Sequence, residues 1–112
     1  MNQLIEIIKQ GRGIKYHFPP LARLGKLFEE GGEFSETVLH NQGYLPHKTP
    51  KESPFGEAAD VLICLVDTLA SLYPELSPER IGEILESQLL IKRGKWQRVV
   101  IDPGNLKECV NV

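Results

Sequence analysis

Four carboxylates occur in this chain as two pairs, and the members of each pair are three residues apart. Glu30 and Glu33 form the first pair, and Glu57 and Asp60 form the second. Residues at this spacing share one face of an α-helix, so each pair would present two carboxylates on one side. Oxygen ligands without His or Cys favour Mg²⁺, or Mn²⁺, over zinc. The spacing predicts a cation site, provided that two helices form and face each other.

The first pair lies in a segment, residues 21–41, whose apolar side chains recur at helical spacing. These are Leu24, Leu27, Phe28, Phe34, Val38 and Leu39. Gly43 follows as a typical helix stop. On a helical projection Glu30 and Glu33 lie at the edge of the apolar stripe, whereas Glu29 lies further toward the polar side. The pattern predicts a helix that turns the first pair toward the core margin.

Two consecutive glycines, Gly31 and Gly32, interrupt this predicted helix. Each costs roughly 1 kcal/mol of helix stability relative to alanine. Two explanations are compatible with each other: close approach of a neighbouring helix, and room for a ligand beside the acids.

The second pair lies in residues 56–72, where apolar side chains point nearly all round the predicted helix. Such a helix is expected to be buried. One of its faces carries the polar residues Glu57, Asp60, Cys64, Asp67 and Ser71. Ionised carboxylates on a buried helix cost several kcal/mol each unless a counter-charge compensates. A metal ion, raised pKa values or an ion pair would each answer this cost. The ion pair is the less favoured explanation, because the matching face of the helix over 21–41 also offers carboxylates and no arginine beyond Arg23 at its start.

The other segments complete a helical chain. A short helix is predicted over 2–10 and a third long helix over 78–93, ending near Gly94. Residues 42–56 read as a loop, and the tail 98–112 as a short strand or an arm onto another subunit. With 112 residues, 41% of them apolar, the chain suits one all-α domain, an antiparallel bundle of about four helices. A domain this small often leaves a helical face unburied, so a homodimer or homotetramer is expected.

A small basic cluster closes the third predicted helix, formed by Lys92, Arg93 and Lys95 with Trp96 beside them. Cations at a helix C-terminus are favourable in themselves. The alternative is a clamp for substrate phosphate through Lys92 and Lys95, with Trp96 as a possible stacking surface for a base. Three loop residues could also meet phosphate, although each alone is more often solvated: His47, Lys48 and Lys51.

Composition excludes several classes of partner. The net charge of −2 and the lack of a long basic run argue against a nucleic-acid polymer. The apolar run over 58–72 is broken by Asp60 and Asp67 and is too short to span a bilayer, and no signal-peptide pattern opens the chain. Cys64 and Cys109 form neither a metal spacing nor a disulfide framework. These features lead us to expect a soluble, cytoplasmic protein.

In their order, the acidic motifs resemble the signature of the MazG-like, all-α nucleotide pyrophosphohydrolase family. That signature is Glu-Glu-x-x-Glu on one helix and Glu-x-x-Asp on the next. In this chain it corresponds to Glu29, Glu30 and Glu33, followed by Glu57 and Asp60. The resemblance implies that Glu30, Glu33, Glu57 and Asp60 are metal ligands. It also implies that Glu29, Glu30 and Glu33 are catalytic, with Glu29 an additional ligand or the group that orients or deprotonates water.

The resemblance covers residues 21–72 closely and residues 92–96 more loosely. It implies Mg²⁺-dependent hydrolysis of a nucleoside triphosphate, often a deoxynucleotide, to the monophosphate and pyrophosphate. It also implies phosphate contacts from Lys92 and Lys95, and assembly as a dimer or tetramer. Members usually carry an Asn near those lysines, and residues 85–98 contain none.

Two other functions remain open. A phosphoribosyl-ATP pyrophosphohydrolase of histidine synthesis belongs to the same family. A non-enzymatic helical module, whose acids bind a structural cation or a basic partner, belongs to a different class. Mg²⁺-dependent release of pyrophosphate from a nucleotide would distinguish an enzyme from such a module.

Overall fold

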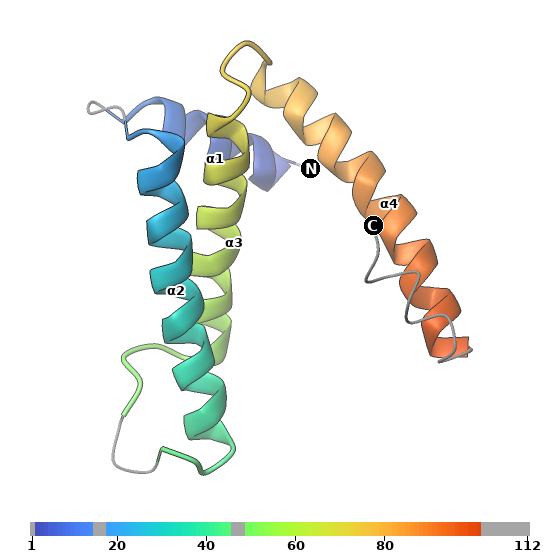
Figure 1. The fold of residues 1–112 in the computed structure, drawn as a ribbon. Helices are drawn as coiled ribbons and strands as arrows, with labels where there is room; N and C mark the ends of the chain where they lie inside the picture. The colour runs from blue at the N-terminus through green and yellow to red at the C-terminus, as the bar shows by residue number, and fades with distance from the viewer. Residues whose placement is uncertain (1, 15–17, 46–48, 102–112) are drawn as a thin grey trace.

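The computed structural model describes residues 2–14, 18–45 and 49–101, and in these residues it contains helices and no strand. The four helices are α1 (Asn2–Arg12), α2 (Pro20–Asn41), α3 (Pro54–Ser71) and α4 (Pro78–Ile101) (Figure 1). The predicted all-α fold is therefore confirmed. The helices that were expected to carry the two acidic pairs are α2 and α3.

Local sequence signals place the helix ends. α2 starts with Pro20 in its first turn, where proline lacks only an N–H that has no helical partner. In α3 the Ser53 hydroxyl accepts a hydrogen bond of 3.2 Å from the Gly56 N–H, which caps the first turn. Beyond α2, Gly43 adopts a φ of +84°, a backbone conformation that glycine reaches without a steric cost. Each end coincides with a residue whose chemistry favours it.

The helices α2 and α3 pack side by side as an antiparallel hairpin, and α1 crosses one end of it (Figure 1). The buried apolar core lies at that end and consists of Ile8, Val66, Ala70 and Ile81. It joins α1 to α3 and to the first turns of α4. From there α4 diverges from the hairpin, so no third helix among the described residues covers the opposite end of the hairpin.

The last helix is longer than the sequence indicated. It was expected to end near Gly94, with a strand or an arm over residues 98–112, but α4 continues to Ile101. Gly94 does not end the helix, because the residues after it include Lys95, Gln97 and Arg98, which favour helix. One glycine inside a helix costs only about 1 kcal/mol. Residues 102–112 lie outside the described part of the chain.

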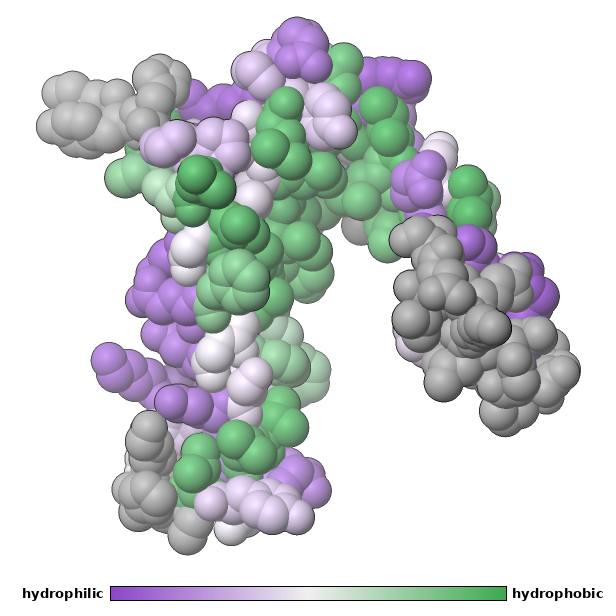
Figure 2. All heavy atoms as spheres, in the orientation of Figure 1, coloured by the Kyte–Doolittle hydropathy of each residue, from purple (hydrophilic) through white to green (hydrophobic). Residues whose placement is uncertain are grey.

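Much apolar side-chain surface stays uncovered in one chain. The radius of gyration is 16.6 Å, against about 13 Å for a compact chain of this length. Figure 2 shows hydrophobic residues gathered on the side of the hairpin that faces the diverging α4. The most exposed large apolar side chains on the helices are Leu21, Phe28, Phe55, Leu62, Leu90 and Trp96. Among the described residues, no helix is both long enough and apolar enough to cross a membrane.

Candidate metal centre

The hairpin brings three of the four predicted ligands together. Glu30 and Glu33 project from α2 and Glu57 projects from the first turn of α3, and one carboxylate oxygen from each lies within 4.8 Å of the others. Asp60 belongs to a second group with Glu52 and Glu57, whose oxygens are equally close. Glu57 is therefore common to two groups of three acids.

Two of these carboxylates are buried, and burial of an ionised carboxylate is costly. Glu30 is 8% exposed and Glu57 is 5% exposed. Within the described residues, one oxygen of each, Oε2, is buried without a hydrogen-bond partner. A buried polar oxygen left unsatisfied costs about 1–3 kcal/mol, and a charged one costs more. Carboxylate oxygens without hydrogen-bond partners are suitable ligands for Mg²⁺ or Mn²⁺. The predicted ligands therefore fit either ion.

Lys26 compensates part of this charge. Its ammonium lies 3.1 Å from Glu30 Oε1 and 3.5 Å from a carboxylate oxygen of Glu29. The bond to Glu30 and the charge of Glu29 raise the pKa of Lys26. Lys26 thus binds one carboxylate oxygen of Glu30, Oε1, whereas the other oxygen, Oε2, has no partner among the described residues. Glu29 is exposed, lies outside both groups of three acids, and faces this lysine.

The pKa values of three carboxyl groups are raised by their neighbours. The charge of Glu30 raises the pKa of Glu33. Burial raises the pKa of Glu57, and the charge of Glu33 adds to it. A hydrogen bond with Asp60, and then its charge, raise the pKa of Glu52. All three shifts have the sign expected when carboxyl groups are held close to one another.

These shifts predict how the metal-free protein responds to pH. A carboxyl group with a raised pKa binds protons more tightly in the folded state, so stability falls as pH rises above the ordinary value of 4.5 and through the raised values. In EDTA, we expect a higher melting temperature at about pH 5 than at about pH 7.5, and the Glu33→Gln variant should reduce that difference. Mg²⁺ at about 100 times its Kd should add about 2.7 kcal/mol at the higher pH. A melting temperature that climbs steadily with pH in EDTA would contradict the expectation.

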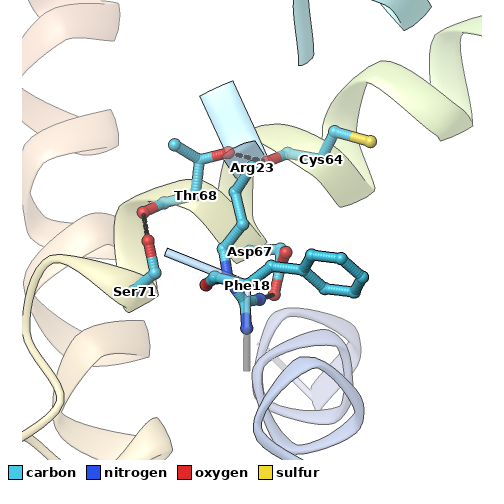
Figure 3. Close-up of polar contacts among 6 residues, drawn as sticks. All are labelled: Phe18, Arg23, Cys64, Asp67, Thr68 and Ser71. Atoms are coloured by element: carbon cyan, nitrogen blue, oxygen red, sulfur yellow. Dashed lines mark hydrogen bonds and ion pairs between the residues drawn. The ribbon is translucent and has the colours of Figure 1, made fainter. Parts of the chain in front are cut away.

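Asp67, on the same face of α3, is not part of the acidic groups. It forms an ion pair with Arg23 of α2, whose Nε donates to the Phe18 carbonyl at 2.8 Å (Figure 3). The side chains of Arg23 and Asp67 are 11% and 22% exposed. The ion-pair explanation considered for this helix is therefore right for Asp67, two turns beyond Asp60, and we exclude Asp67 as a metal ligand.

Two hollows lie along the hairpin, and one of them borders the acids of the metal centre. One, of about 360 Å³, is bounded by Glu33 and Glu57 and also by His40, Thr49 and Lys51, which are groups that can meet phosphate. The other, of about 580 Å³, has apolar walls from Ile14, Phe18 and Ala22 and reaches the acidic end at Lys26 and Glu29. The first hollow therefore borders carboxylates of the metal centre, whereas the second contacts only Glu29 and Lys26 at its margin.

The basic cluster is not brought to the acids within one chain. Lys92, Lys95 and Trp96 lie in the C-terminal half of α4, which runs away from the hairpin (Figure 1). None of the three lines either hollow beside the acids. Their roles in binding phosphate and base stay predictions. Of the loop lysines and histidine, Lys51 reaches a hollow, whereas His47 and Lys48 lie outside the described residues.

Glu52 is the site residue that sequence reasoning missed. It lies in the loop before α3, where helical spacing cannot be used to predict the direction of a side chain. One signal was present: Ser53-Pro54 marks a helix start, which places Glu52 just before the cap, above the first turn that carries Glu57.

Comparisons with known proteins assign no family to the chain. No protein-family model matches it, and the searches of curated proteins and of solved structures found no match.

Proposed function

We propose that this chain is a Mg²⁺-dependent nucleoside triphosphate pyrophosphohydrolase, which converts a (d)NTP and water to the (d)NMP and pyrophosphate. The observation that carries the proposal is the meeting of Glu30, Glu33 and Glu57 on facing helices, with two buried oxygens left without partners. The order of the acidic motifs, which resembles the MazG-like family, supports the same reaction. The protein would act in the cytoplasm.

The acids would have different roles, according to their positions. Glu30, Glu33, Glu57 and Asp60 would hold the ion. When bound, Mg²⁺ would neutralise charge on the phosphates and lower the pKa of a bound water. Glu29, exposed beside Lys26, would accept a proton from the attacking water or orient it. A new bond then forms between the water oxygen and the α-phosphorus, the α–β phosphoanhydride bond breaks, and pyrophosphate leaves.

Self-association is part of the proposal, and α2 offers the surface for it. Leu21, Gly25, Phe28, Gly32 and Leu39 follow one another at steps of three, four and seven residues, which places them on one stripe of the helix. Leu21 is 81% and Phe28 is 72% exposed. A Cβ at Gly25 or at Gly32 would meet nothing within 4 Å among the described residues. Small and apolar residues on an open face suit the close approach of a helix from a second copy, in a homodimer or homotetramer. A second copy is also what would bring Lys92 and Lys95 to the acids.

A charge at the centre of this stripe tests the assembly. We expect Phe28→Asp to convert the oligomer to a monomer in light scattering, because the carboxylate would be desolvated at the contact. Helical content should be retained, since Phe28 is largely exposed in its own chain. Tyr44→Asp, an equally exposed aromatic residue beyond the end of α2, is the matched control and should leave the mass unchanged. A wild-type chain that is monomeric at working concentration contradicts this part of the proposal.

A pyrophosphate-release screen tests the activity itself. The canonical and modified nucleoside triphosphates, together with phosphoribosyl-ATP, are incubated with the full chain in Mg²⁺ and in EDTA. We expect release from at least one triphosphate, in Mg²⁺ only. Release from phosphoribosyl-ATP alone would identify the enzyme of histidine synthesis instead. No release from any of them would leave a non-enzymatic cation-binding module as the function.

A further inference from the structure

The hollow of about 360 Å³ beside the metal centre is bounded by three parts of the chain. The helix α2 supplies Glu33 and His40, the first turn of α3 supplies Glu57, and the connection between the two helices supplies Thr49 and Lys51. This connection lies at the end of the hairpin away from α1 (Figure 1). Because Glu33 and Glu57 are predicted metal ligands, a cation that they bind would lie at the wall of the hollow.

Lys51 brings a positive charge to this hollow, and the charge is unpaired. Its side chain lines the same space as Glu33 and Glu57, yet it forms no ion pair with either carboxylate or with any other acid of the described residues. Lys26, by contrast, pairs directly with Glu30 at 3.1 Å. An unpaired ammonium beside two carboxylates leaves room for an anion, provided that a cation neutralises the acids.

Prolines restrict the backbone on both sides of Lys51. Pro50 fixes its own φ near about −65° and disfavours helical conformation at Thr49. Pro54 begins α3 directly after the cap residue Ser53. Lys51 therefore lies on a short segment with limited backbone freedom, and less entropy is lost when its side chain binds a ligand.

The side chains around the hollow suit an anion better than a base. Small-molecule sites that hold flat apolar groups are lined mainly by hydrophobic and aromatic side chains. Apart from its acids and one proline, this hollow is lined by His40, Lys51, Thr37 and Thr49. The Thr37 hydroxyl already donates to the Glu33 carbonyl at 3.0 Å, so His40, Lys51 and Thr49 are the groups available to phosphate oxygens. The volume is near the lower end of the range of about 300–1,000 Å³ for ligand sites, which suits one part of a nucleotide.

We propose that this hollow binds the β- and γ-phosphates of the (d)NTP, which leave as pyrophosphate, and that Lys51 is the cation that holds them. The inference rests on the proposed function and names the place where one part of its substrate binds. The acids repel phosphate until Mg²⁺ neutralises them, so pyrophosphate binding requires the metal ion. The family resemblance gives phosphate contacts to Lys92 and Lys95, whereas Lys51 is the lysine that lines the hollow beside the acids.

A simpler explanation is that Lys51 is a solvated lysine whose charge only offsets that of the nearby acids. In that case its removal would tighten the binding of divalent cations, and the affinity for pyrophosphate would not change once the cation site is full. In the proposal, removal of the Lys51 charge lowers the affinity for pyrophosphate even at saturating Mg²⁺.

Isothermal titration calorimetry of the full chain with inorganic pyrophosphate measures this affinity, in saturating Mg²⁺ and in EDTA. We expect binding in Mg²⁺ only. Lys51→Met keeps a long side chain and removes its charge, and it should raise the Kd about tenfold, the effect of losing one charge-assisted hydrogen bond from an exposed lysine. Lys51→Arg should restore most of the affinity, because a guanidinium also binds phosphate.

Lys9→Met is the matched control. It removes an exposed lysine charge from α1, at the other end of the hairpin, where Lys9 pairs with Glu6 and Glu79 at 3.8 Å. The Kd for pyrophosphate should stay at the wild-type value, and circular dichroism verifies that each variant is folded. The proposal is overturned by a wild type that binds no pyrophosphate in Mg²⁺, by wild-type affinity in Lys51→Met, or by an equal loss in Lys9→Met.

Failure of this proposal is distinguishable from failure of the proposed function. Hydrolysis of a nucleoside triphosphate, with an unchanged affinity for pyrophosphate in Lys51→Met, would retain the enzyme and reject the role of Lys51. Mg²⁺-dependent binding of pyrophosphate that is weakened in Lys51→Met, without hydrolysis of any triphosphate, would retain the hollow as a diphosphate site and reject the enzyme.

Discussion

Replacement of Glu57 by Gln should lower the turnover of nucleoside triphosphate by about 100-fold or more. Charge stabilisation by a metal ion supplies several kcal/mol at the transition state, and each 1.36 kcal/mol corresponds to about tenfold in rate. Glu57 is the acid common to both groups, so its loss weakens every cation that they hold. Pyrophosphate release at saturating Mg²⁺ measures the effect.

The same substitution should stabilise the metal-free fold. Burial and the charges of Glu33 and Glu52 raise the pKa of Glu57, so the ionised form is disfavoured in the folded state. A neutral amide of similar shape removes that charge, and the melting temperature in EDTA near neutral pH should rise. Glu33→Gln and Asp60→Asn are expected to change activity and stability in the same directions.

Glu83→Gln provides the control for charge removal. Glu83 forms an exposed pair with Arg80 on α4, outside the acidic groups, and its substitution should leave turnover unchanged. Wild-type turnover in Glu57→Gln at saturating Mg²⁺ would remove Glu57 from the mechanism. Loss of both activity and helical content would instead mean that the residue is needed for folding.

Asp67→Ala should destabilise the chain by about 3 kcal/mol or more, because it leaves the Arg23 side chain, which is only 11% exposed, without its carboxylate partner. The free energy of unfolding by urea, at fixed protein concentration and in EDTA, measures the loss. The pair also joins α2 to α3 near the end where α1 crosses, so it supports the hairpin that presents the acids. Activity at saturating Mg²⁺ should survive wherever the variant remains folded.

An exposed ion pair provides the comparison. Arg80 and Glu83 are 59% and 68% exposed, and breaking such a pair costs only about 0.3–0.5 kcal/mol. A double variant, Arg23→Met with Asp67→Leu, should recover most of the loss, because no charge is then left buried. If Asp67→Ala and Glu83→Ala lowered the free energy of unfolding equally, the Arg23–Asp67 pair would be no better shielded from water than the surface pair.

The two central helices were predictable from periodicity, and so was the meeting of Glu30, Glu33 and Glu57. Apolar residues at helical spacing decide which face of α2 is buried, and acids at the edge of that face must lie near the next helix. The same projection placed Asp67 with Glu57 and Asp60. It could not show that Arg23, seven residues before Glu30, reaches across to Asp67, because a long side chain moves its charge well away from its own helical position.

Neither the position of Glu52 nor the length and direction of α4 could be predicted from helical periodicity. Glu52 belongs to a loop, whose backbone has no period, and its position depends on a cap by Ser53 and on the missing side chain of Gly56. The length of α4 depends on whether neighbouring residues outweigh one glycine, a difference of about 1 kcal/mol that no pattern resolves. Its direction depends on packing against α1, which is a tertiary contact.

Arg12 gives the first helix a function beyond filling the core. From the last turn of α1 its guanidinium donates to the carbonyls of Leu76 and Tyr73, at 2.6 and 2.9 Å. Both carbonyls belong to the connection between α3 and α4, the only covalent joint between the hairpin and the last helix. The guanidinium therefore ties that connection to α1 and adds to the packing of α1 against α4, which holds the direction of the last helix. The placement of the basic end of α4 thus depends on contacts made by α1, at the other end of the described chain.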